Sequence, residues 1–365
     1  MYWQVFLIAF LSSLGLAILF TFLVKNVAIK FKLFDWPAPR RIHPRPLPRL
    51  GGVAIFLAFV LVILFFTTGA GGHFLVFDKH LAGFLAGATL LVLVMIVDDI
   101  RGLSPWVKLF WQIVAALIII VVGIGIDFIT NPLGGIYLLN GYQIPIIIAG
   151  TTYHFAVLAD LFTLVWIVGI INVVNFLDGL DGLAAGIAAI VGFVLFFLSM
   201  VPGVNQPATA LLAITLAGCS LGFLIFNFYP AKIFMGDTGS HFLGFTIAIL
   251  AIFSGGKIAT ALLVLGFPIL DGLWVVLNRI FKKRSPFMAD KTHLHHRLLD
   301  LGMSQREVVF SIYFLCACFG IIALFLRSKG KLIALSLLGL LMVAIIISLF
   351  IISSRKKLSD QSDKK

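Results

Sequence analysis

The sequence has little charge. Only 12% of its 365 residues are Asp, Glu, Lys or Arg, whereas 61% are hydrophobic. The polar stretches between the apolar runs are mostly too short to build a separate soluble core. This composition excludes a soluble multidomain protein and indicates a polytopic membrane protein, with one integral domain over residues 1–353 and a basic tail over residues 354–365.

Cysteine is also scarce. The three cysteines, Cys219, Cys316 and Cys318, all lie inside apolar runs, where we interpret them as packing residues. None lies in a polar segment, which argues against a cysteine-ligated zinc site.

What the sequence does have is a succession of apolar runs near the ~20 residues that cross a bilayer. Runs this long and this continuously apolar fit helices rather than the alternating strands of a barrel, because the backbone must satisfy its own hydrogen bonds in lipid. The predicted fold class is therefore an all-α polytopic membrane protein with about 11 transmembrane helices. We expect these spans near residues 4–24, 51–68, 81–97, 107–126, 160–174, 183–200, 208–226, 240–254, 258–280, 307–326 and 332–352.

The basic residues set the predicted topology. If the N-terminus lies outside and the first run is retained rather than cleaved, 22 of the 27 Lys and Arg fall in inside segments. That asymmetry satisfies the positive-inside rule and places the C-terminal tail in the cytoplasm. The net charge of +12 then reflects topology and anionic lipid headgroups, and not nucleic acid.

Two local patterns predict smaller structural features. Asn140-Gly141 lies between apolar flanks in GIYLLNGYQIPIII, which predicts a short extracellular β-hairpin near residues 136–148. Ser304 and Glu307 have the spacing of a capping box, which predicts the start of the tenth span.

Acidic residues are few, and their placement is informative. Asp98-Asp99 ends the third predicted span, Asp178 and Asp181 follow the fifth, and Asp237 follows the seventh, all on the inner side. A transporter would be expected to place its charges near mid-bilayer. Helix capping accounts for one carboxylate but not readily for five. The pattern favours a site at the inner membrane surface.

The spacing within NFLDGLDG suggests how two of these carboxylates cooperate. Asp178 and Asp181 would be neighbours on a helix and would face one pocket. Gly179 and Gly182 would let backbone or ligand approach closely.

A second motif is NFYPAKIFMGDTGSHFLGF, in which residues 236–240 open a predicted helix. Backbone amides and the Asp237 carboxylate would meet there, where phosphate and a hard cation could bind together. Phe234 either stacks on a base or anchors the segment at the membrane interface.

Two basic loops complete the inner side. His293, His295, His296 and Arg297 form a donor-rich patch suited to diphosphate oxygens, with a zinc site at His293 and His296 as the alternative. In the first inside loop, Arg41 and His43 could close over an anionic substrate, or the loop could be only a positive-inside anchor. Together with the carboxylates, these loops indicate Mg²⁺-assisted phosphoryl transfer at the inner leaflet. A transporter of lipid-linked or nucleotide-linked sugars and a purely structural scaffold remain the alternatives.

At these residues the sequence resembles the polyprenyl-phosphate N-acetylhexosamine-1-phosphate transferase family, which includes the bacterial phospho-MurNAc-pentapeptide translocase. The resemblance runs from residue 35 to residue 302. The matching segments, in family order, are DWPAPRRIHPRPLPRLGG, VDDIRGLSPWVK, NVVNFLDGLDGLAAG, NFYPAKIFMGDTGSHFLG and HLHHRLLDLG.

Two segments, Asp98-Asp99-Ile100 and HLHHR, resemble the branch that moves GlcNAc-1-phosphate from UDP-GlcNAc to undecaprenyl phosphate and releases UMP. The resemblance implies a bacterial cytoplasmic membrane enzyme whose active site faces the cytoplasm. Such enzymes initiate O-antigen, enterobacterial common antigen or teichoic acid synthesis. Another UDP-N-acetylhexosamine donor or phospho-MurNAc-pentapeptide transfer stays open. So does the oligomeric state, a homodimer included.

The resemblance also implies roles for single residues. Asp237 would ligate Mg²⁺, with Mn²⁺ as a possible substitute, and Asp99 would help to organise the metal. Asp98 would accept the proton of, or orient, the lipid phosphate, in a direct displacement or by way of a covalent phospho-Asp intermediate. Lys108 would pair with phosphate. The residues expected to hold the uridine or the donor phosphates are Asn175, Asp178, Asp181 and, by stacking on uracil, Phe234.

Overall fold

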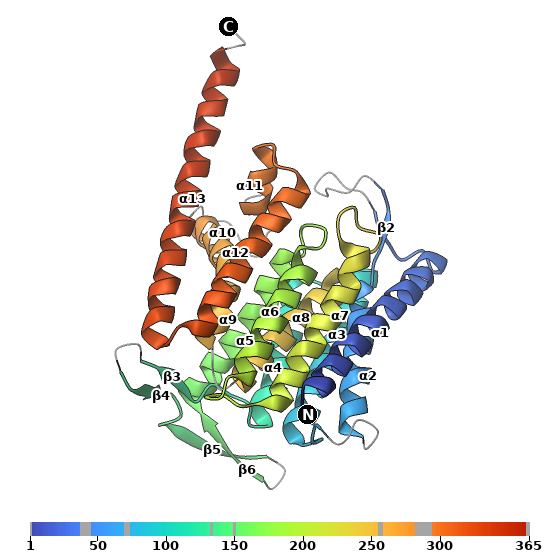
Figure 1. The fold of residues 1–365 in the computed structure, drawn as a ribbon, viewed down its shortest axis with the longest axis vertical. Coiled ribbons are helices and arrows are strands. Elements are labelled where there is room, and N and C mark those ends of the chain that lie inside the picture. The colour runs from blue at the N-terminus through green and yellow to red at the C-terminus, as the bar shows by residue number, and fades with distance from the viewer. Residues whose placement is uncertain are drawn as a thin grey trace.

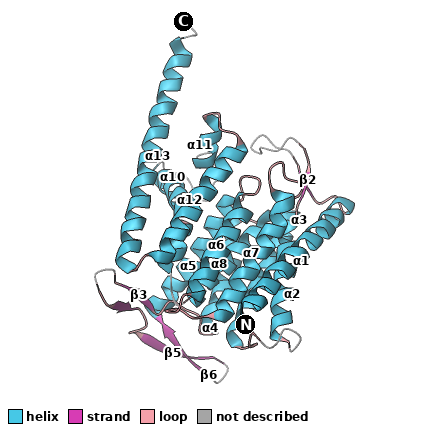
Figure 2. Ribbon diagram, in the orientation of Figure 1, coloured by secondary structure: helices cyan, strands magenta, loops and turns pink. Residues whose placement is uncertain are grey.

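The computed structural model describes residues 2–36, 45–68, 74–131, 134–148, 151–254, 258–281 and 294–362. Within these ranges the chain is a helical bundle with three two-stranded sheets at its ends (Figure 1; Figure 2). The predicted site residues Arg41, His43 and His293 lie outside the described residues.

The helices follow the apolar runs. In chain order they are α1 (Tyr2–Lys30), α2 (Gly51–Thr67), α3 (Lys79–Arg101), α4 (Pro105–Val121), α5 (Val157–Leu177), α6 (Leu183–Met200), α7 (Pro207–Asn227), α8 (Gly236–Phe253), α9 (Ile258–Val264), α10 (Gly266–Phe281), α11 (Leu294–Asp300), α12 (Gln305–Phe325) and α13 (Ser328–Ser362).

Each of the eleven predicted spans coincides with one helix or, for residues 258–280, with the pair α9 and α10. Among the described residues, eight helices are long and apolar enough to cross a membrane, and α9 and α10 form a further candidate that is bent by 77°. The break precedes Pro268, which has no N–H to donate to the carbonyl four residues earlier. Because α2 and α4 have only 17 residues each, the polytopic architecture is confirmed but the count of eleven crossings stays a prediction.

The predicted hairpin across Asn140-Gly141 is wrong in its pairing. Strand β3 (Phe128–Thr130) pairs with β4 (Ile136–Leu138), and β5 (Gln143–Ile148) pairs with β6 (Thr151–Ala156), both antiparallel. The turn before β4 contains two glycines at positive φ, Gly134 and Gly135, and is closed by hydrogen bonds with Asn131. That turn joins β3 and β4 into a hairpin, so β4 pairs with β3 and not with β5.

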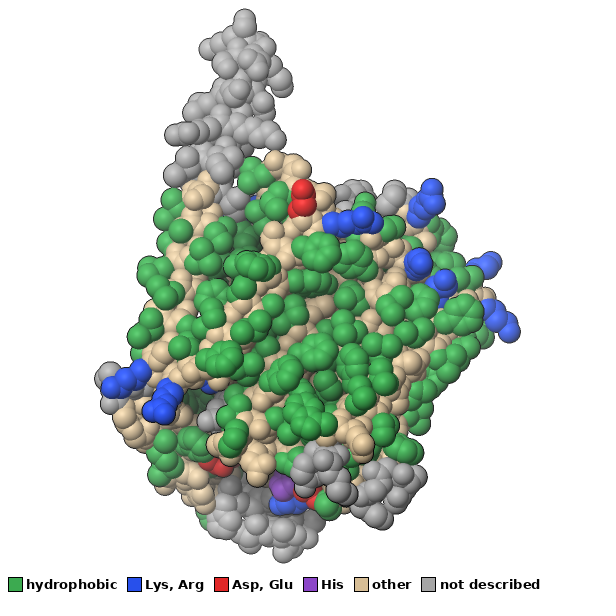
Figure 3. Space-filling view, viewed as in Figure 1, with side chains coloured by type: hydrophobic (Ala, Val, Ile, Leu, Met, Phe, Trp, Pro, Cys, Tyr) green, Lys and Arg blue, Asp and Glu red, His purple; other side chains and the backbone are tan. Residues whose placement is uncertain are grey.

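Helix α8 forms the centre of the bundle. Nearly all of its residues are buried, and it contacts α2, α3 and α5. Aromatic rings fill the space between these helices: Phe242 of α8 meets Phe59 of α2 edge-on, and Phe245 stacks on Phe84 of α3. On the outside of the bundle, hydrophobic side chains cover the face seen in Figure 3, with Lys and Arg at the margins of that face. Helix α8 is therefore held by packing on several sides.

Two smaller predictions are confirmed. The capping box at α12 is present: Glu307 N donates to Ser304 Oγ at 3.3 Å, and Ser304 N donates to Glu307 Oε2 at 2.7 Å. The cysteines are free, with Cys219 and Cys316 buried and Cys318 partly buried, as expected for packing residues.

Candidate functional site

Three carboxylates from distant parts of the sequence meet at one end of the bundle. Asp98 and Asp99 belong to the last turn of α3, and Asp237 belongs to the first turn of α8. One carboxylate oxygen of each lies within 4.8 Å of the others, the one such group of possible metal ligands in the described part of the chain. This arrangement of hard oxygen donors could hold a metal ion, and it suits Mg²⁺ or Mn²⁺ better than zinc.

Lys108 supplies a positive charge to this cluster from the first turn of α4. Its Nζ lies 2.8 Å from Asp98 Oδ2 and 2.6 Å from Asp237 Oδ2. The other oxygen of Asp98 accepts a hydrogen bond from Leu103 N at 2.6 Å, which fixes the short connection between α3 and α4. The ammonium of Lys108 thus stands between two carboxylates that could also hold a divalent cation, so the donor set fits a cation.

Asp99 caps α8. Its Oδ1 accepts from Asp237 N at 2.9 Å, and its Oδ2 accepts from Thr238 N at 3.1 Å and Thr238 Oγ1 at 2.6 Å. The first amides of a helix have no partner within the helix, and a carboxylate is stabilised there by the helix dipole. Asp99 therefore fixes the backbone that carries Asp237, in addition to any contact with a metal.

This cap requires glycine at position 236. Gly236 has φ of 73°, and a Cβ added there would overlap the Asp99 carboxylate. We expect Gly236→Ala to lower kcat/KM by about a hundredfold, because the methyl group displaces Asp99 and misplaces Asp237. The left-handed backbone adds a cost of ~1–2 kcal/mol.

Gly135→Ala is the matched control for this prediction. Gly135 also has positive φ, 80°, but it lies in the turn before β4, away from the site, and no atom lies within 4 Å of a Cβ added there. The variant should share the backbone strain, measured as a lower melting temperature, and keep most of the activity. Equal loss of activity in the two variants would contradict the capping role.

Arg49 is a site residue that sequence reasoning missed. Its guanidinium lies 3.5 Å from an Asp35 carboxylate oxygen and 3.6 Å from Asp99 Oδ1. Burial opposes the charge, but the carboxylates of Asp99 and Asp35 outweigh it and raise the pKa of Arg49. Arg49 is one of several basic residues in the predicted first inside loop, and its position just before Gly51-Gly52 was a usable signal.

The glycines after Arg49 bring α2 against the start of α8. Gly51 N donates to Phe234 O and Gly52 N donates to Met235 O, both at 2.9 Å. A Cβ at Gly52 would overlap the backbone of Gly239, so the two helix starts cross in direct backbone contact. Phe234 N also donates to Pro48 O at 2.8 Å, which ties the Phe234 backbone into this crossing. Stacking of the Phe234 ring on uracil stays a prediction.

Asn175 and Asp178 lie beside the cluster at the end of α5. Asn175 Nδ2 donates to Ser240 Oγ at 2.9 Å, one turn into α8. Burial and the nearby carboxylates of Asp237 and Asp99 raise the pKa of Asp178 well above its usual range.

The spacing of Asp178 and Asp181 suggested that they share a helix face, and this prediction is wrong. Helix α5 ends at Leu177, and the following turn reaches α6 through Gly182 at φ of 81°. Asp181 Oδ2 accepts from Ala231 N at 3.0 Å and so connects this turn to the α7–α8 loop. Its contribution to substrate binding stays a prediction.

The structure assigns a role to Asp271, for which the sequence offered none. Asp271 is buried in α10, and its Oδ1 accepts from Leu294 N at 2.8 Å, the first residue of α11. This contact positions the helix that carries His295, His296 and Arg297, of which the Arg297 side chain is half-buried. The side chains of His295 and His296 lie outside the described residues, so the diphosphate and zinc interpretations both stay predictions.

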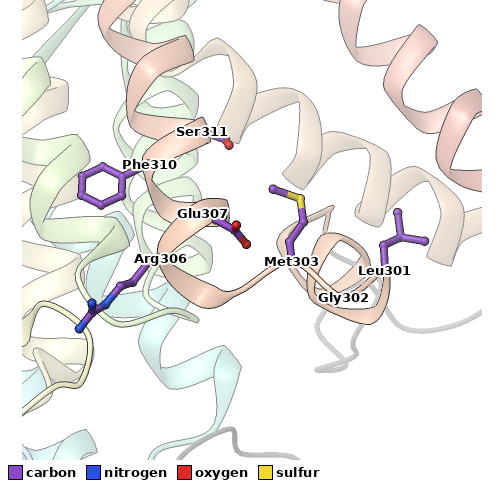
Figure 4. Close-up of a pocket in the computed structure, with 7 residues that line it drawn as sticks. All are labelled: Leu301, Gly302, Met303, Arg306, Glu307, Phe310 and Ser311. Atoms are coloured by element: carbon purple, nitrogen blue, oxygen red, sulfur yellow. The ribbon is translucent and has the colours of Figure 1, made fainter.

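A separate surface hollow lies where α11 leads into α12 (Figure 4). None of the predicted site residues lines it, and it is therefore distinct from the carboxylate cluster. Its lining residues are Leu301, Gly302, Met303, Arg306, Glu307, Phe310 and Ser311.

Comparison with known proteins agrees with the motifs. A family model described as glycosyl transferase family 4 matches residues 81–255. A Bacillus subtilis protein named "Probable undecaprenyl-phosphate N-acetylglucosaminyl 1-phosphate transferase" is 34% identical over 342 residues, which cover 92% of this chain and 89% of that protein.

Two further relatives carry similar names. A Mycobacterium leprae decaprenyl-phosphate N-acetylglucosaminephosphotransferase is 34% identical over 80% of this chain and 76% of its own length. An undecaprenyl-phosphate alpha-N-acetylglucosaminyl 1-phosphate transferase of Salmonella typhi is 28% identical over 79% of this chain and 75% of its own length. On this likeness the chain belongs to glycosyl transferase family 4, the family of polyprenyl-phosphate N-acetylhexosamine-1-phosphate transferases that its motifs resemble.

Proposed function

We propose that this protein transfers GlcNAc-1-phosphate from UDP-GlcNAc to undecaprenyl phosphate and releases UMP. The observation that carries the proposal is the meeting of Asp98, Asp237 and Lys108 at the first turn of α8. The names of the relatives support both GlcNAc-1-phosphate as the transferred group and a polyprenyl phosphate as the acceptor.

The reaction takes place at the cytoplasmic face of the bacterial cytoplasmic membrane and starts cell-envelope polysaccharide synthesis. The orientation is supported by the concentration of Lys and Arg in the predicted inside segments, which include the loops that contribute the site. Another UDP-N-acetylhexosamine is the main alternative donor.

Asp237 and Asp99 would hold a Mg²⁺ ion, and Asp98 borders the same position. Bound there, Mg²⁺ would supply positive charge that offsets the negative charge developing on the departing UMP. Lys108, which lies beside Asp98 and Asp237, contacts the donor phosphates. Asn175 and Asp178 hold the uridine or donor phosphates from the end of α5.

Asp98 orients the acceptor phosphate and takes its proton when one is present. Because a phosphate monoester has a second pKa of about 6, the acceptor is already largely dianionic at neutral pH and needs little base catalysis. A direct displacement at the donor phosphorus therefore suffices. A covalent phospho-Asp intermediate is the competing route.

The test is a transfer assay with purified protein, undecaprenyl phosphate and a panel of radiolabelled UDP-sugars. We expect UDP-GlcNAc to give label in butanol-extractable lipid, with formation of UMP and complete dependence on a divalent cation. Faster transfer from UDP-GalNAc would replace the donor. Movement of sugar across the membrane with no lipid diphosphate formed would instead support a transporter.

A further inference from the structure

A buried chain of polar side chains links α4, α5 and α8 beneath the carboxylate cluster. Gln112 and His241 are almost fully buried, with exposed fractions of 2% and 1%. Gln112 Nε2 lies 3.0 Å from His241 Nε2, and Asn172 Nδ2 donates to Gln112 Oε1 at 2.8 Å. At the other end, His241 Nδ1 lies 2.9 Å from the main-chain carbonyl oxygen of Asp237. The chain therefore ends on a residue of the cluster itself.

The hydrogen bonds among these side chains all run in one direction, from Asn172 through Gln112 and His241 to Asp237. Asn172 Nδ2 also donates to Val168 O at 2.8 Å, and a carbonyl only accepts, so the amide nitrogen of Asn172 faces Gln112 Oε1. Gln112 then presents its N–H to His241 Nε2, which must be the unprotonated ring nitrogen. His241 is neutral in this arrangement and donates its Nδ1–H to Asp237 O. The side chains of Gln112 and His241 are thus hydrogen-bonded at both of their polar ends.

Each member of the chain lies one helical turn deeper in the bundle than a residue of the candidate site. In an α-helix a spacing of three or four residues places two side chains on the same face. The pairs are Lys108 and Gln112 on α4, Asp237 and His241 on α8, and Asn175 and Asn172 on α5.

We propose that Gln112, His241 and Asn172 are positioning residues that fix the register of α4 and α5 against α8. Apolar packing alone selects register poorly in a membrane, because lipid tails are as apolar as the side chains of the helices. Polar groups buried there are unfavourable unless they are paired, so each helix is held where its partner is available. This register sets the meeting of Lys108 with Asp237. The proposal rests on the proposed function and extends it to a layer that touches neither substrate.

The test compares Gln112→Met with Trp166→Phe in the transfer assay. Gln112→Met keeps the size of the side chain but removes both contacts of Gln112. Trp166→Phe removes another buried hydrogen bond, from Trp166 Nε1 to Ala248 O at 3.1 Å, which joins α5 to α8 eleven residues beyond Asp237, or ~16 Å along the helix. The control therefore breaks the same kind of contact far from the site.

We expect Gln112→Met to lower kcat by about ten- to a hundredfold with KM for UDP-GlcNAc within about twofold, because small misplacements of reacting groups are costly. Trp166→Phe should lower the melting temperature by a similar amount and leave kcat near that of the unmodified protein. If Gln112→Met is not recovered folded, Asn172→Leu takes its place, because it removes the hydrogen bonds to Gln112 and to Val168 O but leaves the contact between Gln112 and His241.

Equal kcat in Gln112→Met and Trp166→Phe, with the unmodified protein active, would overturn the positioning role alone. A loss of activity that a lower folded fraction fully explains would overturn it as well. Absence of transfer by the unmodified protein with every UDP-sugar would overturn the proposed function and the positioning role together.

Discussion

Asp237→Asn is expected to reduce kcat/KM by a thousandfold or more while the melting temperature stays within about 3 °C of the unmodified protein. The substitution keeps the size of the side chain. It also keeps the backbone N–H of residue 237, which donates a hydrogen bond to Asp99, so the start of α8 remains capped. It removes one of the carboxylates around the proposed metal position and one of the two partners of Lys108. The loss should therefore fall on chemistry and not on folding.

Asp78→Asn provides the matched control. Asp78 is also a carboxylate at a helix start, where its Oδ1 accepts from Leu81 N at 2.9 Å, but it belongs to the opposite end of α3. Asparagine caps helices as well as aspartate does, so activity should hardly change. Retention of more than about a tenth of the rate in Asp237→Asn, a loss under ~1.4 kcal/mol, would rule out Asp237 as a metal ligand in the reaction.

Lys108→Met is expected to lower transfer by at least about a hundredfold and, at the same time, to tighten binding of a divalent cation. The ammonium contacts Asp98 and Asp237, two of the carboxylates that would hold a metal. Before the donor binds, the ammonium and the metal ion therefore compete for the same carboxylates. Removing the ammonium leaves the carboxylates available. When donor phosphates are present they supply Lys108 with another partner, so donor and metal should strengthen each other's binding.

Mn²⁺ binding followed by electron paramagnetic resonance measures this effect without turnover. We expect a dissociation constant at least about fivefold lower in Lys108→Met, a factor worth ~1 kcal/mol. The enhancement of Mn²⁺ affinity by UMP should shrink in the same variant. Lys108→Arg, which keeps the charge, is the control and should bind Mn²⁺ as weakly as the unmodified protein. Weaker binding in Lys108→Met would show that Lys108 supports the metal and does not compete with it.

The cluster was predictable because its residues combine a rare type with a consistent position. Charges are few in this chain, and Asp98, Asp99 and Asp237 each end or begin an apolar run on the predicted inner side. Helix ends on one side of a membrane can meet even when they are far apart in sequence. The sequence did not indicate that Asp99 would cap α8, since that role depends on how the two helix ends approach each other.

Features that depend on pairing between segments were not predictable to the same degree. Arg49 was one of several basic residues in the predicted inner loop, whose charge the predicted topology already explained. The hairpin pairing was decided by competition between two turns, one at Asn140-Gly141 and one at Gly134-Gly135. Gln112 and His241 are 129 positions apart, so no local pattern connects them.

The most direct measurement is an anomalous difference map from crystals of the protein grown with Mn²⁺ and UMP. We expect a peak within coordinating distance of a carboxylate oxygen of Asp237, on the side that faces Asp98 and Asp99. The Lys108 ammonium should have moved away from that position and toward the nucleotide phosphate. A peak beside His293, His295 or His296, with none beside Asp237, would show that Asp237 does not hold the metal.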